Sequence, residues 1–194
     1  MKLVAGIQKG RRLKQPVTAT LRPTSAKVRE ALFAILSDRI QDATVLDLYA
    51  GTGALGLEAL SRGAAHVVFL DHDPTSLRVL RDNILRCASQ EKSRVIRQDV
   101  NRFLRALPTG DDAERFDLIF VDPPYHTGEV ESVLELLGRT PILSPSGILV
   151  MEHFSKQQLP ARSGNLAQYR RTRYGDTTLS FYSLVSTPQG PSCA

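Results

Sequence analysis

Cysteine, histidine and tryptophan are scarce in this sequence of 194 residues, which contains two cysteines, four histidines and no tryptophan. Cys87 and Cys193 match no spacing of metal or redox motifs, and they are compatible with a reducing cytoplasm. None of the histidines has a second ligand at metal spacing; they are His66, His72, His126 and His153. We therefore expect no bound metal.

Long apolar runs are also missing. No stretch approaches the ~18 consecutive apolar residues that span a bilayer. Residues 1–16 contain no long apolar region of the kind that secretory signals carry. Hydrophobic residues make up 42% of the chain and charged residues 23%, which is ordinary for a single soluble domain. We expect a cytoplasmic monomer that does not contact a membrane.

Positive charge is in excess, and it is unevenly placed. The formal net charge is +5, yet residues 1–30 contain eight basic residues against the single acid Glu30. A second basic cluster, without acids, spans residues 162–173. Clustered Lys and Arg are typical of a surface that binds a polyanion, although a solvated surface has the same composition. The candidate residues for this contact are Arg11, Arg12, Lys14, Arg22, Lys27, Arg29, Arg170, Arg171 and Arg173.

Strand and helix patterns alternate along the chain. Short apolar runs typical of buried strands are separated by stretches with apolar residues at helical spacing. This alternation predicts an α/β fold with a mostly parallel sheet that helices cover on both faces. The strand runs are 44–49, 66–71, 94–99, 116–122 and 147–153, and the helical stretches are 22–40, 53–63, 74–88 and 129–139.

The end of the chain breaks this alternation. Residues 166–185 form two alternating runs around Gly175-Asp176, which predicts a hairpin that adds antiparallel strand pairing. We therefore expect a Rossmann-like sheet of seven strands. Three regions are expected, namely a basic N-terminal segment with a helix, a core and a disordered tail, over residues 1–42, 43–187 and 188–194.

The expected carboxyl ends of the strands are rich in carboxylates and glycines. Gly51, Gly53 and Gly56 match the pattern G-x-G-x-x-G, and Asp71 follows 20 residues after Gly51. Dinucleotide-binding proteins share this spacing, and there the acid holds the ribose hydroxyls. However, Asp47 precedes the glycines and would repel a pyrophosphate at the helix N-terminus.

A ligand with positive charges suits these acids better. S-adenosylmethionine (SAM) carries a sulfonium and an ammonium group and lacks that phosphate. In this interpretation Asp71 holds the ribose, Asp99 accepts from the adenine amino group, and the glycines let the methionine part approach the backbone. For His72 a surface position is the alternative. The predicted cofactor site consists of Asp47, Tyr49, Ala50, Gly51, Gly53, Asp71, His72, Asp99 and Val100.

The run FDLIFVDPPY ends a strand in an acid, two prolines and an aromatic ring. A rigid turn would explain the prolines but not the acid at the ligand edge. An amine that attacks a sulfonium methyl group must direct its lone pair, and Asp122 with the Pro123 carbonyl offers two preorganised acceptors. Positive charge develops on that nitrogen in the transition state, where the carboxylate stabilises it most. The predicted catalytic residues are Asp122, Pro123, Pro124 and Tyr125, whose ring offers a stacking face for a base.

The sequence resembles the bacterial family of SAM-dependent methyltransferases that modify the N2 amine of a guanine in 16S ribosomal RNA. The resemblance extends to about residue 153 and rests on AGIQKGRRLK, LRPTSAKVREALFAIL, VLDLYAGTGALGLEALSRGA, FDLIFVDPPY and GILVMEH. It implies a class I methyltransferase fold, SAM as cofactor, and ribosomal RNA within a small-subunit particle as the partner of the basic residues. Asp71 departs from the family, in which a glutamate is expected, and the C-terminal hairpin matches no motif.

Two alternatives remain open from the sequence. The motif Asp-Pro-Pro-Tyr is shared with other amino-methyltransferases, so a DNA adenine-N6 enzyme fits the same chemistry. The sequence contains no obvious target-recognition domain, which counts against a sequence-specific DNA enzyme. A nucleotide-binding or RNA-binding protein without catalysis is the other alternative, although binding alone would not need Asp122.

Overall fold

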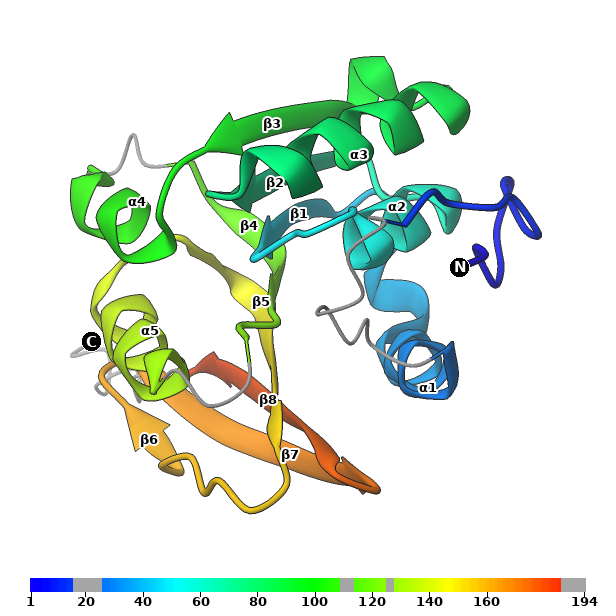
Figure 1. The fold of residues 1–194 in the computed structure, drawn as a ribbon. Helices are drawn as coiled ribbons and strands as arrows, with labels where there is room; N and C mark the ends of the chain where they lie inside the picture. The colour runs from blue at the N-terminus through cyan, green and yellow to red at the C-terminus, as the bar shows by residue number, and fades with distance from the viewer. Residues whose placement is uncertain (16–25, 109–113, 125–127, 186–194) are drawn as a thin grey trace, which may run out of the picture.

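One mixed sheet organises the computed structural model, which describes residues 1–15, 26–108, 114–124 and 128–185 (Figure 1). The strand order is β3-β2-β1-β4-β5-β8-β7-β6. Neighbouring strands run parallel from β3 to β5, and the pairs β5–β8, β8–β7 and β7–β6 are antiparallel. The strands are β1 Thr44–Leu48, β2 His66–Asp71, β3 Ser93–Arg97, β4 Phe116–Val121, β5 Leu143–Phe154, β6 Arg162–Ser163, β7 Leu166–Tyr174 and β8 Thr177–Leu184. The helices are α1 Ala26–Leu36, α2 Ala54–Ser61, α3 Pro74–Arg86, α4 Val100–Ala106 and α5 Glu129–Arg139, with short 3-10 turns at Ser37–Arg39 and Gln90–Lys92.

This architecture confirms the predicted mostly parallel α/β fold and its antiparallel C-terminal hairpin. The described sheet has eight strands rather than the expected seven, because β6 pairs with β7. A strand of two residues is too short to show a period of two. The sequence patterns also do not predict α4, a seven-residue helix that begins where the Asp99 side chain accepts the Arg102 N–H at 2.8 Å. The beginning of the predicted helical stretch 22–40 and the predicted tail lie outside the described residues.

Buried apolar side chains form a core on each face of the sheet. Residues such as Val45 and Phe69 pack with α1, α2, α3 and the N-terminal segment, whereas Leu46 and Leu70 pack with α4 and α5. Figure 1 shows α4 and α5 apart from the other three helices, across the sheet. Because helices cover both faces, a ligand can reach the central strands at their ends. Within the described ranges, no helix is long and apolar enough to cross a membrane.

The N-terminal segment packs against α2 and α3. Leu3 and Leu13 belong to the core. The Glu58 carboxylate of α2 is fully buried and accepts the Val4 N–H at 2.8 Å and the Ala5 N–H at 3.0 Å. A buried acid on a helix thus fixes the backbone that presents the basic residues of the segment.

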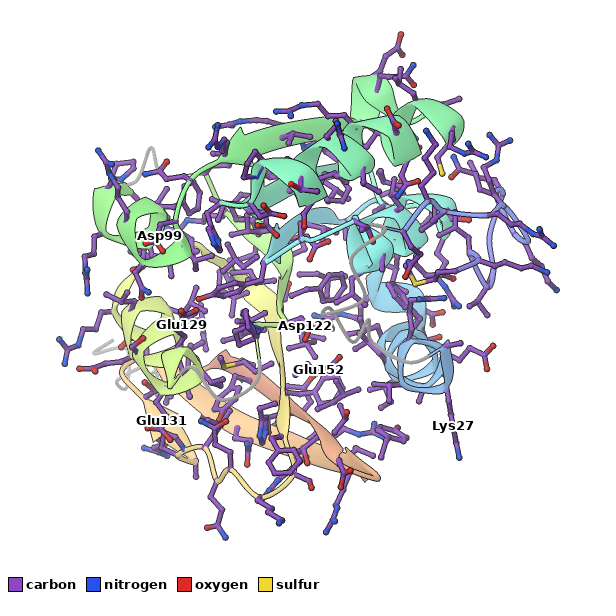
Figure 2. The ribbon with its side chains drawn as sticks, viewed as in Figure 1. Lys27, Asp99, Asp122, Glu129, Glu131 and Glu152 are labelled. Atoms are coloured by element: carbon purple, nitrogen blue, oxygen red, sulfur yellow. The ribbon has the colours of Figure 1, made fainter. Side chains whose placement is uncertain are left out.

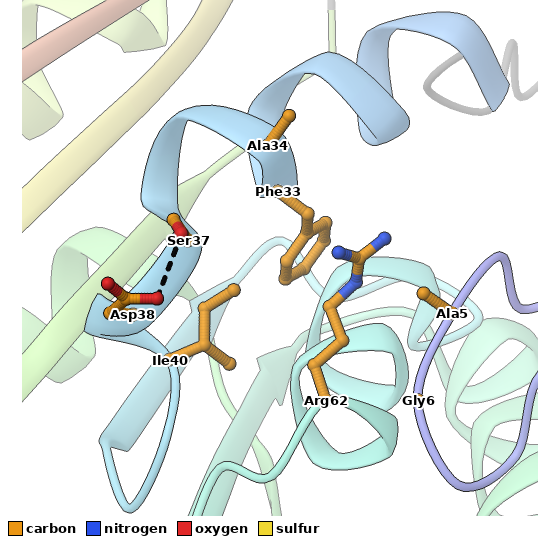
Figure 3. Close-up of a pocket in the computed structure, with 8 residues that line it drawn as sticks. All are labelled: Ala5, Gly6, Phe33, Ala34, Ser37, Asp38, Ile40 and Arg62. Carbon is orange, nitrogen blue, oxygen red and sulfur yellow. Dashed lines mark hydrogen bonds between the residues drawn. The ribbon is translucent and has the colours of Figure 1, made fainter.

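A hollow lies where this segment meets the ends of α1 and α2 (Figure 3). The Arg62 guanidinium lies over the Phe33 ring, 4.8 Å from its centre, and Arg62 Nε donates to Glu58 at 2.8 Å. Since α2 ends here, the hollow is at the amino edge of the sheet and contains none of the predicted cofactor or catalytic residues. Its lining residues are Ala5, Gly6, Phe33, Ala34, Ser37, Asp38, Ile40 and Arg62.

Candidate active site

A glycine turn follows β1 at the carboxyl edge of the sheet. The backbone takes left-handed conformations at Tyr49 (φ 61°), Gly51 (φ 54°) and Gly53 (φ 82°). The Asp71 carboxylate, at the end of β2, accepts the Gly51 N–H at 2.7 Å and the Asp73 N–H at 2.9 Å. The acid of the second strand therefore holds the turn after the first strand in place.

Asp47 lies beneath this turn. Its side chain is buried, and Oδ2 accepts the Gly56 N–H in α2 at 2.9 Å. Burial, with a smaller contribution from the Asp71 charge, raises the pKa of Asp47 to about 7 even though the hydrogen bond from the Gly56 N–H acts to lower it. The sequence predicts that this acid faces the ligand, whereas in the structure it is buried and holds the first turn of α2 through the Gly56 N–H. A direct contact with the cofactor stays a prediction.

The three glycines of the motif have different surroundings. A Cβ at Gly53 would lie 2.4 Å from a leucine methyl of α3, and a Cβ at Gly56 would lie 2.3 Å from an aromatic ring of β2. These two glycines let elements pack closely. A Cβ at Gly51 would meet nothing nearer than a carbonyl oxygen at 3.9 Å. The backbone at Gly51 therefore borders open space that a ligand can enter.

The acids around the turn fit a positively charged ligand. The Gly51 N–H, which could bind a phosphate, donates to the Asp71 carboxylate instead. A pyrophosphate would face that negative charge at short range, whereas a sulfonium or an ammonium group would be attracted. Asp99 is exposed at the start of α4, on the strand-end side of the sheet. The residues present therefore fit SAM better than a dinucleotide.

The remaining predicted cofactor residues differ in exposure. Ala50 is buried, and its N–H donates to the Leu70 carbonyl at 3.0 Å, which ties the turn to β2. Val100, the first residue of α4, is buried as part of the core. The His72 side chain is 68% exposed, with Nδ1 3.8 Å from Asp71 Oδ1. His72 therefore lies at the surface beside the acid that is expected to bind ribose.

Glu129, the first residue of α5, belongs to the same edge, although the sequence analysis did not name it. Burial and the Glu129 carboxylate raise the pKa of the Tyr49 phenol, and Asp99 contributes in the same direction. Figure 2 shows Asp99 and Glu129 on the neighbouring helices α4 and α5. The sequence does contain an indication that Glu129 belongs to this edge, since it is the first residue of the helix that follows the Asp-Pro-Pro-Tyr motif.

Asp122 follows directly after β4. Leu48 and Val121 are partners in the parallel pair β1–β4, so Asp122 lies at the same edge as the glycine turn. Asp122 is half-buried, Pro123 is buried and Pro124 is exposed. The fourth member of the predicted catalytic motif, Tyr125, lies outside the described residues.

The predicted RNA-binding residues fall into three groups. Arg22 lies outside the described residues. Arg29 is wrong as an RNA contact, because it is 1% exposed, donates to the Lys2 carbonyl at 2.7 Å and lies 3.7 Å from Glu58. Its helix buries the face that carries it, and clustered charge in a sequence does not reveal that. The exposed residues are Arg11, Arg12, Lys14, Lys27, which Figure 2 shows on α1, and Arg170, Arg171 and Arg173 on β7.

Helix α3 adds arginines that the sequence analysis did not assign. An Arg11 guanidinium nitrogen donates to the Arg86 carbonyl, and Lys14 Nζ lies 2.6 Å from Asp82 on the same helix. Lys14 lowers the pKa of Asp82, and Arg78 and Arg86 lower it further. The N-terminal segment and α3 therefore form one basic surface. This α3 basic surface consists of Arg11, Arg12, Lys14, Arg78, Arg81 and Arg86.

Asp47→Asn should remove a pH-dependent part of the stability. The folded protein raises the pKa of Asp47 to about 7, so the protonated acid favours folding, and this contribution is lost as the pH rises through 7. Between pH 5 and pH 8 the wild type should lose about 2–3 kcal/mol of unfolding free energy relative to the variant. Urea unfolding at both pH values measures this difference. Parallel pH profiles would show that Asp47 is ionised throughout.

The sheet, the glycine turn after β1 and the acids at the following strand ends define a Rossmann-like class I methyltransferase. The chain belongs to the family described as conserved hypothetical protein 95, whose profile matches residues 1–183. The family and the fold class predicted from the sequence are thereby confirmed.

Named relatives agree with this assignment. Ribosomal RNA small subunit methyltransferase D of Escherichia coli (strain K12) is 33% identical over 194 residues, which cover 100% of this chain and 94% of the relative. The protein of the same name from Haemophilus influenzae is 37% identical over 154 residues, which cover 78% of each chain. The solved structure of yhhF from Escherichia coli, a candidate methyltransferase, has a TM-score of 0.80 at 33% identity and covers 95% of this chain and 97% of its own.

Proposed function

We propose that the protein transfers a methyl group from SAM to the N2 amine of a guanine in 16S ribosomal RNA. The observation that carries the proposal is the position of Asp122 and Pro123, at the same sheet edge as the open backbone of Gly51. The relatives named as small subunit methyltransferases support ribosomal RNA as the substrate class. The resemblance of the motifs supports guanine N2 as the acceptor.

The cofactor is SAM, which supplies a methyl group on a positively charged sulfur. Gly51 would let its methionine part approach the backbone, and Asp71 would accept hydrogen bonds from the ribose hydroxyls. Asp71 retains acceptor capacity for this role, since each carboxylate oxygen can accept a second hydrogen bond beside the one from the turn. Asp99 would receive the adenine amino group.

Asp122 orients the guanine N2 amine, which is the nucleophile that attacks the methyl group of SAM. Its carboxylate accepts one N2–H, and the Pro123 carbonyl accepts the other, so that the nitrogen lone pair points at the methyl carbon. Formation of the N–C bond would leave the electrons of the S–C bond on sulfur and a positive charge on the nitrogen. The Asp122 carboxylate stabilises this charge, and the surplus proton leaves through it to water.

The basic surfaces hold the RNA backbone around the target. Arginine and lysine contacts to phosphates fix position without reading sequence. Residues 1–42 thus serve RNA binding and residues 43–187 carry the methyltransferase core. The substrate is the RNA within a small-subunit particle, and the enzyme works as a monomer.

Incubation with radiolabelled SAM tests the proposed function. Naked 16S ribosomal RNA, assembled small subunits and adenine-containing DNA are offered in parallel, and the labelled nucleotide is mapped. The expected product is N2-methylguanine in ribosomal RNA. Label on adenine N6 of DNA would support the alternative that shares the Asp-Pro-Pro-Tyr motif, and the absence of label from every substrate would indicate a binding protein without catalysis.

Replacing Arg11, Arg12 and Arg86 together by alanine should weaken RNA binding. For each phosphate that is no longer neutralised, the salt slope of the binding constant should fall by about 0.7–0.9. RNA affinity measured at several salt concentrations gives this slope, and SAM affinity should not change.

The matched control removes exposed arginines from the opposite face of the sheet. Arg105 on α4 and Arg139 on α5 are exposed, and Arg139 pairs with Glu135. Their replacement by alanine should leave the salt slope unchanged. If both variants bind RNA as the wild type does, the α3 basic surface is exposed to solvent and does not contact RNA.

A further inference from the structure

A second acid stands beside Asp122. Val121 of β4 and Met151 of β5 are partners in a parallel pair, so the next residues, Asp122 and Glu152, continue side by side. Neighbouring strands lie about 4.8 Å apart, which places the two backbones within reach of one small ring. Figure 2 shows Asp122 and Glu152 close together at this edge. The mechanism described above gives Glu152 no role.

Both acids belong to the same side of the sheet. Phe120 and Val150, two positions earlier, pack in the core under α1, α2 and α3, whereas the intervening residues of both strands pack on the other side. Side chains alternate between the two faces along a strand, so Asp122 and Glu152 lie on the same face as Phe120 and Val150. Glu152 is 4% exposed, so it lies at the base of this edge rather than on the outer surface.

We propose that Glu152 determines the specificity for guanine by accepting the N1–H of the target base while Asp122 receives the N2 amine. This inference rests on the proposed function. Guanine presents N1–H and N2–H side by side on its Watson–Crick edge, which matches two neighbouring acceptors. An ionised carboxylate accepts hydrogen bonds and cannot donate them. It therefore pairs with the guanine edge and repels the N1 lone pair of adenine, so Glu152 excludes adenine as well as binding guanine.

An RNA that carries 2-aminopurine at the mapped target nucleotide tests this role. 2-Aminopurine keeps the reacting amine but has a lone pair in place of N1–H. The wild type should methylate it with a kcat/KM lower than that for guanine by a factor on the order of 100, because a buried acceptor loses its donor and faces a lone pair. Equal rates on the two bases would overturn the assignment without any variant.

Glu152→Gln provides the second measurement. The amide can turn its NH2 group toward a lone pair, so the ratio of guanine to 2-aminopurine rates should fall by at least about tenfold. A glutamate that only supports the fold would lower both rates together and leave the ratio unchanged. SAM affinity, measured by calorimetry, should be retained. The control is Glu131→Gln, an exposed acid on α5 that Figure 2 shows away from Asp122, and its ratio should equal that of the wild type.

The outcomes separate this inference from the proposed function. N2-methylguanine formed by the wild type, with the same base ratio in Glu152→Gln, would overturn the role of Glu152 alone. Wild-type protein that forms no N2-methylguanine on any ribosomal RNA substrate would overturn the proposed function, and the role of Glu152 with it.

Discussion

Asp122→Ala should lower kcat by a factor on the order of 100 to 1,000, the usual effect of losing one preorganised electrostatic partner. The substitution removes the acceptor that directs the amine and the charge that stabilises the positive nitrogen. The methyl donor should still bind, because the glycine turn is held by Asp71 and Asp47. Single-turnover transfer from labelled SAM gives the rate, and calorimetry gives the cofactor affinity.

Asp122→Asn separates geometry from charge. The amide oxygen still accepts a hydrogen bond, but the negative charge is lost, so we expect a rate between those of the wild type and the alanine variant. Glu135→Ala serves as the control, since this exposed acid lies on α5 and pairs with Arg139. Full activity of Asp122→Ala would show that the carboxylate merely ends a strand, and the proposed mechanism would be abandoned.

Glu58→Ala should lower the free energy of unfolding by about 3–5 kcal/mol, the usual cost of removing one partner of a buried ion pair. Glu58 is fully buried and accepts two backbone N–H groups of the N-terminal segment, and Arg29 beside it is 1% exposed. The variant leaves the Arg29 charge and both N–H groups without this acceptor. Urea unfolding at pH 7 measures the loss.

Two further variants show which interaction is responsible. Arg62 donates to the same carboxylate but is 20% exposed, so Arg62→Ala should cost only about 1 kcal/mol. The double variant Glu58→Leu with Arg29→Met removes both buried charges and should recover part of the loss. A loss below about 1 kcal/mol in Glu58→Ala would mean that the N-terminal segment contributes little to the fold.

Local patterns were enough to determine the fold class. Most of the parallel strands contain a short apolar run and the longer helices show a period of 3.6, so this alternation predicts a parallel sheet with covered faces. The carboxyl ends of parallel strands meet at one edge, which is why Asp71, Asp99 and Asp122 could be assigned to one site before any contact was known. The short elements β6 and α4 were not predicted, because stretches of two and seven residues are too short to show a clear periodicity.

The motif glycines show where local patterns fail. The spacing of Gly51, Gly53 and Gly56 predicts a tight turn, and the structure has one. Spacing does not say which glycine borders open space and which faces a side chain from α3 or β2. That difference depends on how elements far apart in the sequence pack against each other.

Charge is the clearest case of what the sequence alone determined and what the tertiary structure decided. The sequence determined that the first 30 residues are basic, that acids follow the strands and that Asp122 is locked by prolines. The tertiary structure decided that Arg29 is buried against Glu58, that Arg11 joins Arg86 on α3, and that Glu152 continues beside Asp122. Burial and strand register arise from contacts between residues distant in the chain. These contacts determine the solvation and the neighbours of each charged side chain. The function of its charge is therefore decided only in the folded protein.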